Sequence, residues 1–85
     1  MSDIVTTLSE RNARYGCFEA QAEIAQKIKD TMRVPNWDAL APDQKEALDH
    51  IAIKIARIIN GDPNYHDSWH DIVGYAKLIA DRLNP

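Results

Sequence analysis

The chain has 85 residues, of which 45% are hydrophobic and 27% are charged, and its formal net charge is −3. This length suits one small domain near the lower limit at which a single hydrophobic core suffices, and the composition is that of a folded chain rather than a disordered one. The acidic balance argues against duplex DNA as a partner, because a duplex requires a concentrated basic surface, whereas a small nucleotide needs only a few local cations.

Cellular location can be predicted from the cysteine content and the first residues. Cys17 is the one cysteine of the sequence, which excludes an internal disulfide and indicates a reducing compartment. The opening residues, MSDIVTTLSER, have no cationic start followed by an apolar run, so no signal peptide is predicted. No apolar stretch approaches the ~20 residues that cross a bilayer. We therefore expect a cytoplasmic protein without a membrane partner.

The first half of the chain predicts two helices. A short helix is expected from about Asp3 to Tyr15, where Gly16 supplies the backbone freedom to end it. A second helix is expected from about Phe18 to Met32. Its apolar stripe, which should be buried, comprises Phe18, Ile24, Ala25, Ile28 and Met32. Gln21 lies inside that stripe, where it either caps a neighbouring backbone group or faces a ligand cavity.

A loop should follow the second helix, because Pro35 disfavours helical geometry at the preceding residue. Trp37 and Leu40 in this loop are expected to plug the core. A third helix is predicted over residues 42–60, since its first residue is a proline and Gly61 comes directly after its end.

The predicted third helix has two contrasting faces when successive residues are placed about 100° apart. One direction carries the apolar residues Leu48, Ile51, Ala52, Ile55, Ile58 and Ile59. The opposite direction carries the polar residues Glu46, Asp49, His50, Arg57 and Asn60. Ile53 lies in the middle of the polar face, which suggests that this face lines a cleft or is covered by a second subunit. A chain this small also gains stability from a partner, so we predict a homodimer.

A fourth helix should begin at Asp67 as its N-cap and run close to Leu83. Its apolar stripe comprises Trp69, Ile72, Val73, Ala76, Ile79, Ala80 and Leu83. Asp71 and Tyr75 lie on a flank of that stripe, near whichever helix packs alongside. Gly74, in mid-helix, is expected to permit close approach of a neighbour.

The short connection between the last two predicted helices makes them antiparallel neighbours. There is no internal repeat and no linker. We therefore predict one all-α domain over residues 1–85, a compact antiparallel bundle of about four helices.

Acidic side chains recur at helical spacing on the third and fourth predicted helices, namely Glu46, Asp49, Asp67 and Asp71. Carboxylates spaced this way on neighbouring helices are how helical bundles build divalent-metal sites. Oxygen-only ligands favour Mg²⁺ or Mn²⁺ over zinc. The alternative is that Glu46 serves the helix dipole, Asp67 caps a helix and Asp49 is solvated. Asp71 fits that alternative least well, because it lies beside the apolar stripe.

Lys54 and Arg57, three positions apart, are spaced to grip a phosphate or carboxylate, and the arginine offers a bidentate fork. With Tyr75 on the opposing flank they form the predicted ligand-contacting set. The alternative for Arg57 is a structural ion pair with Asp49, Asp71 or Glu46.

The segment that precedes the second helix contains two arginines and a tyrosine close together. Arg11, Arg14 and Tyr15 come just before the glycine turn, where they either form an anion pocket at the start of the second helix or belong to an amphipathic helix with solvated arginines.

The segments ERNARYGCF, EALDHIAIKIARI and GDPNYHDSWHDIVGY together resemble a family of small phage and prophage proteins of unassigned function. The Tyr-Gly, Lys-x-x-Arg-Ile and Trp-x-Asp-Ile-x-Gly-Tyr elements occur in the same order, and the resemblance covers nearly the whole chain. More distantly the chain is similar to the MazG-like all-α nucleoside triphosphate pyrophosphohydrolases. That resemblance implies a MazG-like core in which acidic pairs on two helices hold Mg²⁺ while water attacks a phosphate.

On this resemblance Glu46 and Asp49 match the first acidic pair, and Asp71 matches the last acid of the second pair. Ser68 stands where the other acid of the second pair would be, and Asp67 comes one residue earlier. The resemblance therefore implies a phage-type nucleotide-binding protein, located in the host cytoplasm if phage-encoded, and leaves open whether it hydrolyses a nucleoside triphosphate with Mg²⁺. The alternative is a non-catalytic protein that inhibits or sequesters a host defence component.

Overall fold

The computed structural model describes residues 3–84 and contains four α-helices and one short 3₁₀ helix. They are α1 (Asp3–Tyr15), α2 (Phe18–Met32), the 3₁₀ helix η1 (Pro35–Ala39), α3 (Pro42–Asn60) and α4 (His66–Leu83). No β-strand occurs in residues 3–84, so the all-α prediction is confirmed. In the same part of the chain, no helix combines the length and the apolar character needed to cross a membrane.

Local sequence signals account for most of the helix ends. At the start of α3 the Gln44 side chain accepts a hydrogen bond of 2.8 Å from the N–H of Ala41, which compensates for the absence of a capping side chain on alanine. α4 begins at His66 with Tyr65 at the N-cap position, so the prediction that Asp67 is the N-cap was wrong. The Asp67 carboxylate instead accepts a hydrogen bond of 3.1 Å from the Tyr65 hydroxyl.

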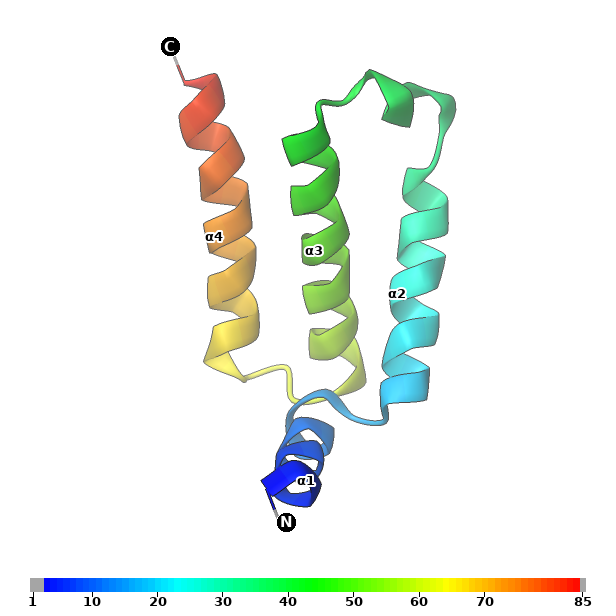
Figure 1. Cartoon of the computed structure of the whole chain (residues 1–85), viewed down its shortest axis with the longest axis vertical. Coiled ribbons are helices and arrows are strands. Elements are labelled where there is room, and N and C mark those ends of the chain that lie inside the picture. Colours follow the sequence, from blue (N-terminus) through cyan, green and yellow to red (C-terminus); the bar gives the residue numbers. More distant parts are fainter. Residues whose placement is uncertain (1–2, 85) are drawn as a thin grey trace.

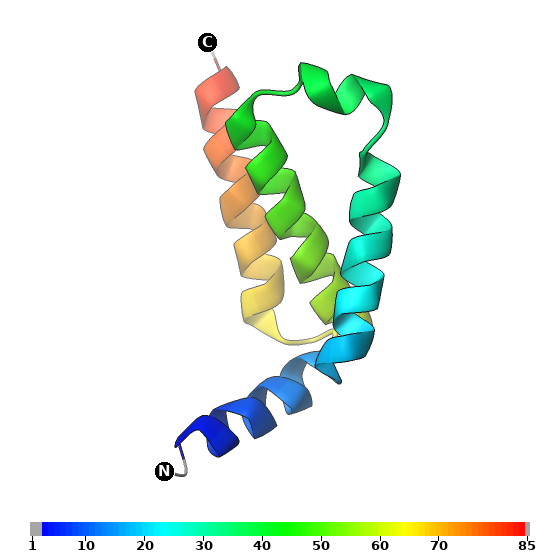
Figure 2. The same ribbon diagram turned by 45° about the vertical axis from the view of Figure 1, so that its right-hand side comes forward.

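Three of the helices form a single layer. α2, α3 and α4 run side by side with α3 in the middle, as Figure 1 shows. α3 packs against both neighbours, whereas α2 and α4 have at most a marginal contact with each other. α1 turns away from the layer at its lower end, which Figure 2 shows from a second direction. At the opposite end of the layer, Arg82 of α4 forms a two-point ion pair with Asp43 of α3.

The core of this layer consists of small side chains. The buried residues of α3 are Ala47, Ala52 and Ala56, and α2 adds Ala25. Alanines let the helix axes approach closely, but they leave no space in which a large side chain becomes fully buried. The Cα radius of gyration is 14.8 Å, against about 12 Å for a compact domain of this length. With α1 directed away from the layer, the chain is more extended than a compact domain, while its helices pack against one another as in the predicted bundle of about four helices.

Many large apolar side chains that the helical periodicity assigned to the core lie on the surface. Phe18 at the start of α2 is 68% exposed. Several apolar residues of α4 are also exposed, namely Trp69, Val73 and Leu83. These burial predictions were wrong because each outer helix of a single layer has only one neighbour, which covers only part of an apolar stripe.

The turn between α1 and α2 packs tightly against the turn between α3 and α4. The Asn60 amide donates hydrogen bonds of 2.8 Å to the Tyr15 carbonyl and 2.9 Å to the Cys17 carbonyl. Gly16 has a φ of 77°, which favours glycine, and a Cβ there would collide with the Asn60 carbonyl. A Cβ at Gly61 would likewise collide with the α1 backbone. The Tyr-Gly element of the sequence is thus explained by packing.

Candidate functional site

An ion pair joins the middle helix to α4. Lys54 Nζ of α3 lies 3.0 Å from Asp71 Oδ2 of α4, and the lysine side chain is only 14% exposed whereas that of the aspartate is 41% exposed. This contact confirms the prediction that Asp71 lies near the third helix. The flank position of Asp71 on α4 and the antiparallel packing of α3 place the two charges together.

Two aromatic rings stack on the same interface. The imidazole of His50 and the ring of Tyr75 lie parallel, with an interplanar angle of 5° and centroids 4.6 Å apart. His50 Nε2 is also 3.0 Å from Glu46 Oε2, one turn earlier on α3. Periodicity had placed His50 on the polar face, but its contact with α4 was not predicted. The predicted proximity of Tyr75 to the third helix is confirmed.

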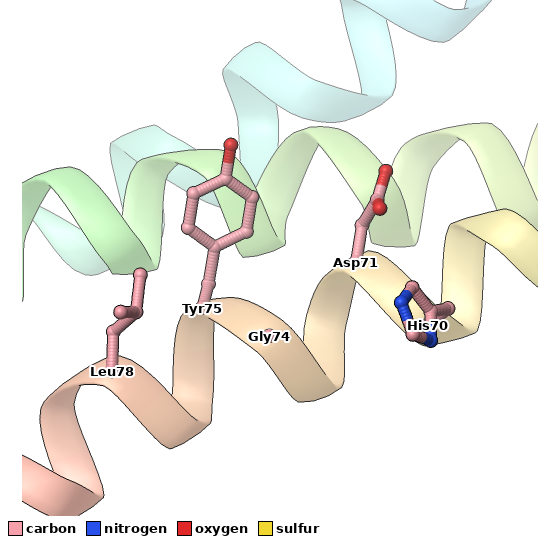
Figure 3. Close-up of a pocket in the computed structure, with 5 residues that line it drawn as sticks. All are labelled: His70, Asp71, Gly74, Tyr75 and Leu78. Carbon is pink, nitrogen blue, oxygen red and sulfur yellow. The ribbon is translucent and has the colours of Figure 1, made fainter.

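We call Glu46, His50, Lys54, Asp71 and Tyr75 the α3–α4 site. Figure 3 shows Asp71 and Tyr75 extending from α4 toward α3, beside a shallow pocket that also has His70, Gly74 and Leu78 in its wall. A Cβ at Gly74 would meet no atom within 4 Å, so the expectation that this glycine permits close helix approach was wrong. The missing side chain leaves the pocket surface open instead.

The remaining predicted acids lie in other surroundings. Asp49 of α3 accepts a hydrogen bond of 2.8 Å from the guanidinium of Arg33, the residue that ends α2. Arg33 also covers the ring of Trp37, 4.1 Å from the centroid. Asp67 pairs with the Tyr65 hydroxyl at the start of α4. Sequence reasoning missed Arg33, since its 16-residue separation from Asp49 gives no periodic signal.

The four predicted metal ligands therefore have four different partners. Among residues 3–84, no three side chains of histidine, cysteine, aspartate or glutamate are grouped so that they could hold a metal ion. Carboxylate oxygens suit Mg²⁺ chemically, but in this arrangement they do not converge on one position. The predicted metal site does not fit the described side chains, and Mg²⁺ binding stays a prediction.

Arg57 belongs to an aromatic cluster rather than to the acids. Its guanidinium lies 4.4 Å from the centroid of the Tyr15 ring, and its buried Nε has no hydrogen-bond partner within residues 3–84. The alternative of an ion pair with Asp49, Asp71 or Glu46 is therefore not found in the described part of the chain. A guanidinium over an aromatic face is held by the negative charge of the ring face.

The same cluster contains further cation–aromatic contacts. The guanidinium of Arg11 lies 5.2 Å from the Tyr15 ring centroid, and that of Arg14 lies 5.1 Å from the Tyr65 ring centroid. The two tyrosine rings meet edge to face at 6.1 Å. Partial burial and the hydrogen bond to Asp67 raise the pKa of Tyr65 above its ordinary value of 10.0, with nearby Arg14 opposing.

The fold and these contacts define a small all-α protein whose central helix carries charged and aromatic side chains toward both neighbours. A family model described as a domain of unknown function, DUF6378, matches residues 2–83, and the chain belongs to this family. The comparisons found no matching curated protein and no matching solved structure.

Proposed function

We propose that the protein binds a nucleotide at the α3–α4 site. The observation that carries this proposal is the Lys54 ammonium group, which is nearly buried yet held by a carboxylate that is 41% exposed. A phosphate can approach the exposed side of this pair and share the lysine. Lysine is a strong point-charge ligand for phosphate.

The proposed relation to phage proteins and to the MazG-like pyrophosphohydrolases is supported by where the shared motifs lie. The Lys-x-x-Arg-Ile element supplies Lys54 and Arg57, and the Trp-x-Asp-Ile-x-Gly-Tyr element supplies Asp71 and Tyr75. Three of these side chains line the α3–α4 interface, although the two motifs are separate in the sequence. Residues that form one ligand site must lie close together in the fold, as the residues of these two motifs do.

A second candidate function is favoured by the partners of the acids. Because Asp49, Asp67 and Asp71 each contact a different cation or hydroxyl group, they leave no shared position for the metal that hydrolysis would need in the MazG-like scheme. This arrangement favours binding without turnover. A protein of this kind would sequester a nucleotide or inhibit a host component rather than act as an enzyme.

We also propose that the protein acts as a homodimer. An apolar groove of about 400 Å³ runs between α3 and α4, and its wall includes Leu40, Leu48, Ile51, Ile79 and Leu83. Covering this groove with a second copy would remove apolar surface that the open layer leaves in water. We expect Leu48→Asp to give monomers in sedimentation analysis.

The alternative dimer interface is the polar face of α3, where Ile53 lies half-buried. The variant Ile53→Asp tests this interface in parallel with Leu48→Asp. If Ile53→Asp dissociates the dimer and Leu48→Asp does not, the polar face is the interface. A wild-type protein that sediments as a monomer at high concentration would refute both versions.

Nucleotide binding is tested by the melting temperature, because any ligand selective for the folded state raises it. We expect nucleoside triphosphates to raise the melting temperature of the wild type, in separate series with Mg²⁺ and with a chelator. Lys54→Met should abolish the rise. Lys27→Met is the matched control, since Lys27 is an exposed lysine of α2 that pairs with Glu23 of the same helix. Pyrophosphate release would establish an enzyme, and the absence of any nucleotide effect would refute the proposal.

A further inference from the structure

A second pocket lies in the corner between α1 and α2, apart from the α3–α4 site. Its volume is about 270 Å³, and its wall includes Arg11, Tyr15, Phe18 and Gln21. The corner is held in place by Gly16, whose left-handed backbone is packed against Asn60. The pocket wall is therefore built from a rigid junction.

The side chain of Gln21 offers this pocket a hydrogen-bonding group for a ligand. Gln21 is 5% exposed, and within residues 3–84 its amide group takes part in no hydrogen bond, although its backbone N–H donates to the Cys17 carbonyl. A primary amide has two donor hydrogens and one acceptor oxygen. The amide nitrogen and oxygen of Gln21 are not among the fully buried unpaired atoms of the described residues, so they remain accessible from the pocket. Because Gln21 lines the pocket, a ligand there can supply the missing hydrogen bonds.

The other walls restrict the chemistry of such a ligand. Phe18 is 68% exposed, so its ring is available for stacking against a flat group. Arg11 forms no ion pair among residues 3–84, where its guanidinium contacts the Tyr15 ring. A nucleotide has the three features that these side chains suit. Its base edge carries a neighbouring donor and acceptor for the Gln21 amide, its flat base can stack on Phe18, and its phosphate can pair with Arg11.

We propose that the α1–α2 pocket binds the nucleoside part of a nucleotide. The Gln21 amide pairs with the edge of the base, Phe18 stacks on its face, and Arg11 binds the adjoining phosphate. The proposal rests on the proposed function in taking the ligand to be a nucleotide. Arg57 connects the two regions, because it lies one turn from Lys54 on α3 and its guanidinium covers the Tyr15 ring in the pocket wall.

Gln21→Met tests the pocket by a change that keeps the side-chain volume and removes the amide. Gln26→Met is the matched control, because Gln26 is an exposed glutamine of the same helix. Calorimetric titration would use nucleoside 5′-monophosphates and nucleosides in chelator. We expect the wild type to bind at least one nucleoside and its monophosphate, with affinity reduced about tenfold or more in Gln21→Met, as for loss of a two-point base contact. The Gln26→Met protein should bind as the wild type does.

The melting temperature provides an independent readout. Gln21→Met should melt close to the wild-type temperature, because it keeps the side-chain volume and the amide that it removes makes no hydrogen bond to residues 3–84. A lower melting temperature together with unchanged binding would mean that Gln21 has a structural role, and the proposal would be overturned. Phe18→Leu should weaken binding with little effect on folding, with the exposed Val34→Ala as control. Failure of every nucleoside to bind would also overturn the proposal.

The pocket proposal and the proposed function fail in different ways. If inorganic triphosphate binds in a Lys54-dependent manner while nucleosides do not bind, the α1–α2 pocket is refuted and the α3–α4 site stands. If nucleoside binding depends on Gln21 while triphosphate affinity is the same in Lys54→Met as in the wild type, the α3–α4 proposal is refuted and the pocket proposal stands.

Discussion

The ion pair between Lys54 and Asp71 can be tested by the stability of Asp71→Asn without any ligand. Two unit charges 3.0 Å apart attract by about 5 kcal/mol at an effective dielectric constant of about 20. Exposure of the carboxylate offsets most of this attraction, because fully exposed pairs contribute only about 0.2–1 kcal/mol. Removing one partner of a buried pair costs about 3–5 kcal/mol. The half-exposed geometry therefore predicts a loss of about 1–2 kcal/mol.

That loss should lower the melting temperature by about 4–16 °C, since each kcal/mol shifts it by about 4–8 °C in a domain of this size. The assay is a double-mutant cycle of Asp71→Asn, Lys54→Met and the double variant, followed by thermal and urea unfolding. We expect the double variant to be more stable than the sum of the two single changes predicts, by about 1 kcal/mol. If Asp71→Asn were as stable as the wild type or more stable, the ion-pair reasoning would be refuted. Such a result would mean that the contact with Lys54 does not stabilise the fold.

Three further predictions concern Gly16, Gly74 and Tyr65. Gly16→Ala should destabilise the fold by at least about 1–3 kcal/mol in urea unfolding, because alanine is strained at this φ and collides with Asn60. Gly74→Ala, where a Cβ meets nothing, should stabilise α4 by about 1 kcal/mol, and a loss of similar size for both variants would contradict this account. The raised pKa of Tyr65 implies that the unfolded state loses this proton first, so its contribution to stability is complete below pH 10.0 and is lost as the pH rises through the raised pKa. Tyr65→Phe should therefore show a flatter stability profile above that pH, and identical alkaline profiles would contradict the hydrogen bond to Asp67.

The candidate site was predictable in part. Periodicity on the fourth helix placed Asp71 and Tyr75 on the flank that faces the third helix, and both side chains contact that helix. The partner of Asp71 was not predictable. Three positions correspond to about 300° around a helix, so Lys54 and Arg57 point about 60° apart. The tilt and rotation of α3 between its neighbours decide which of the two meets the carboxylate.

The helices themselves were determined by the sequence, because the signals that begin and end them act within a few residues. Pro35, Pro42 and Gly16 stop or start helices through backbone geometry. Gly61, which follows α3, is instead required by its close packing against the α1 backbone. Apolar periodicity identified which faces are hydrophobic, but not how much of each face would be covered. Coverage depends on how many helices surround each one, and a layer with α3 in the middle gives α2 and α4 only one neighbour each within the layer, to which α1 adds a small contact with α2.

The tertiary structure alone decided which charged and polar groups meet. The contacts of Arg33 with Asp49 and of Asn60 with the Tyr15 carbonyl join residues far apart in the chain, at positions set by how the two corners pack. The same packing placed the Gln21 side chain in the wall of the α1–α2 pocket without a hydrogen bond to the described residues. A helical period reports the direction of a side chain around its own axis. The group that it meets there depends on the position of another helix, which is fixed by burial and close packing over the whole fold.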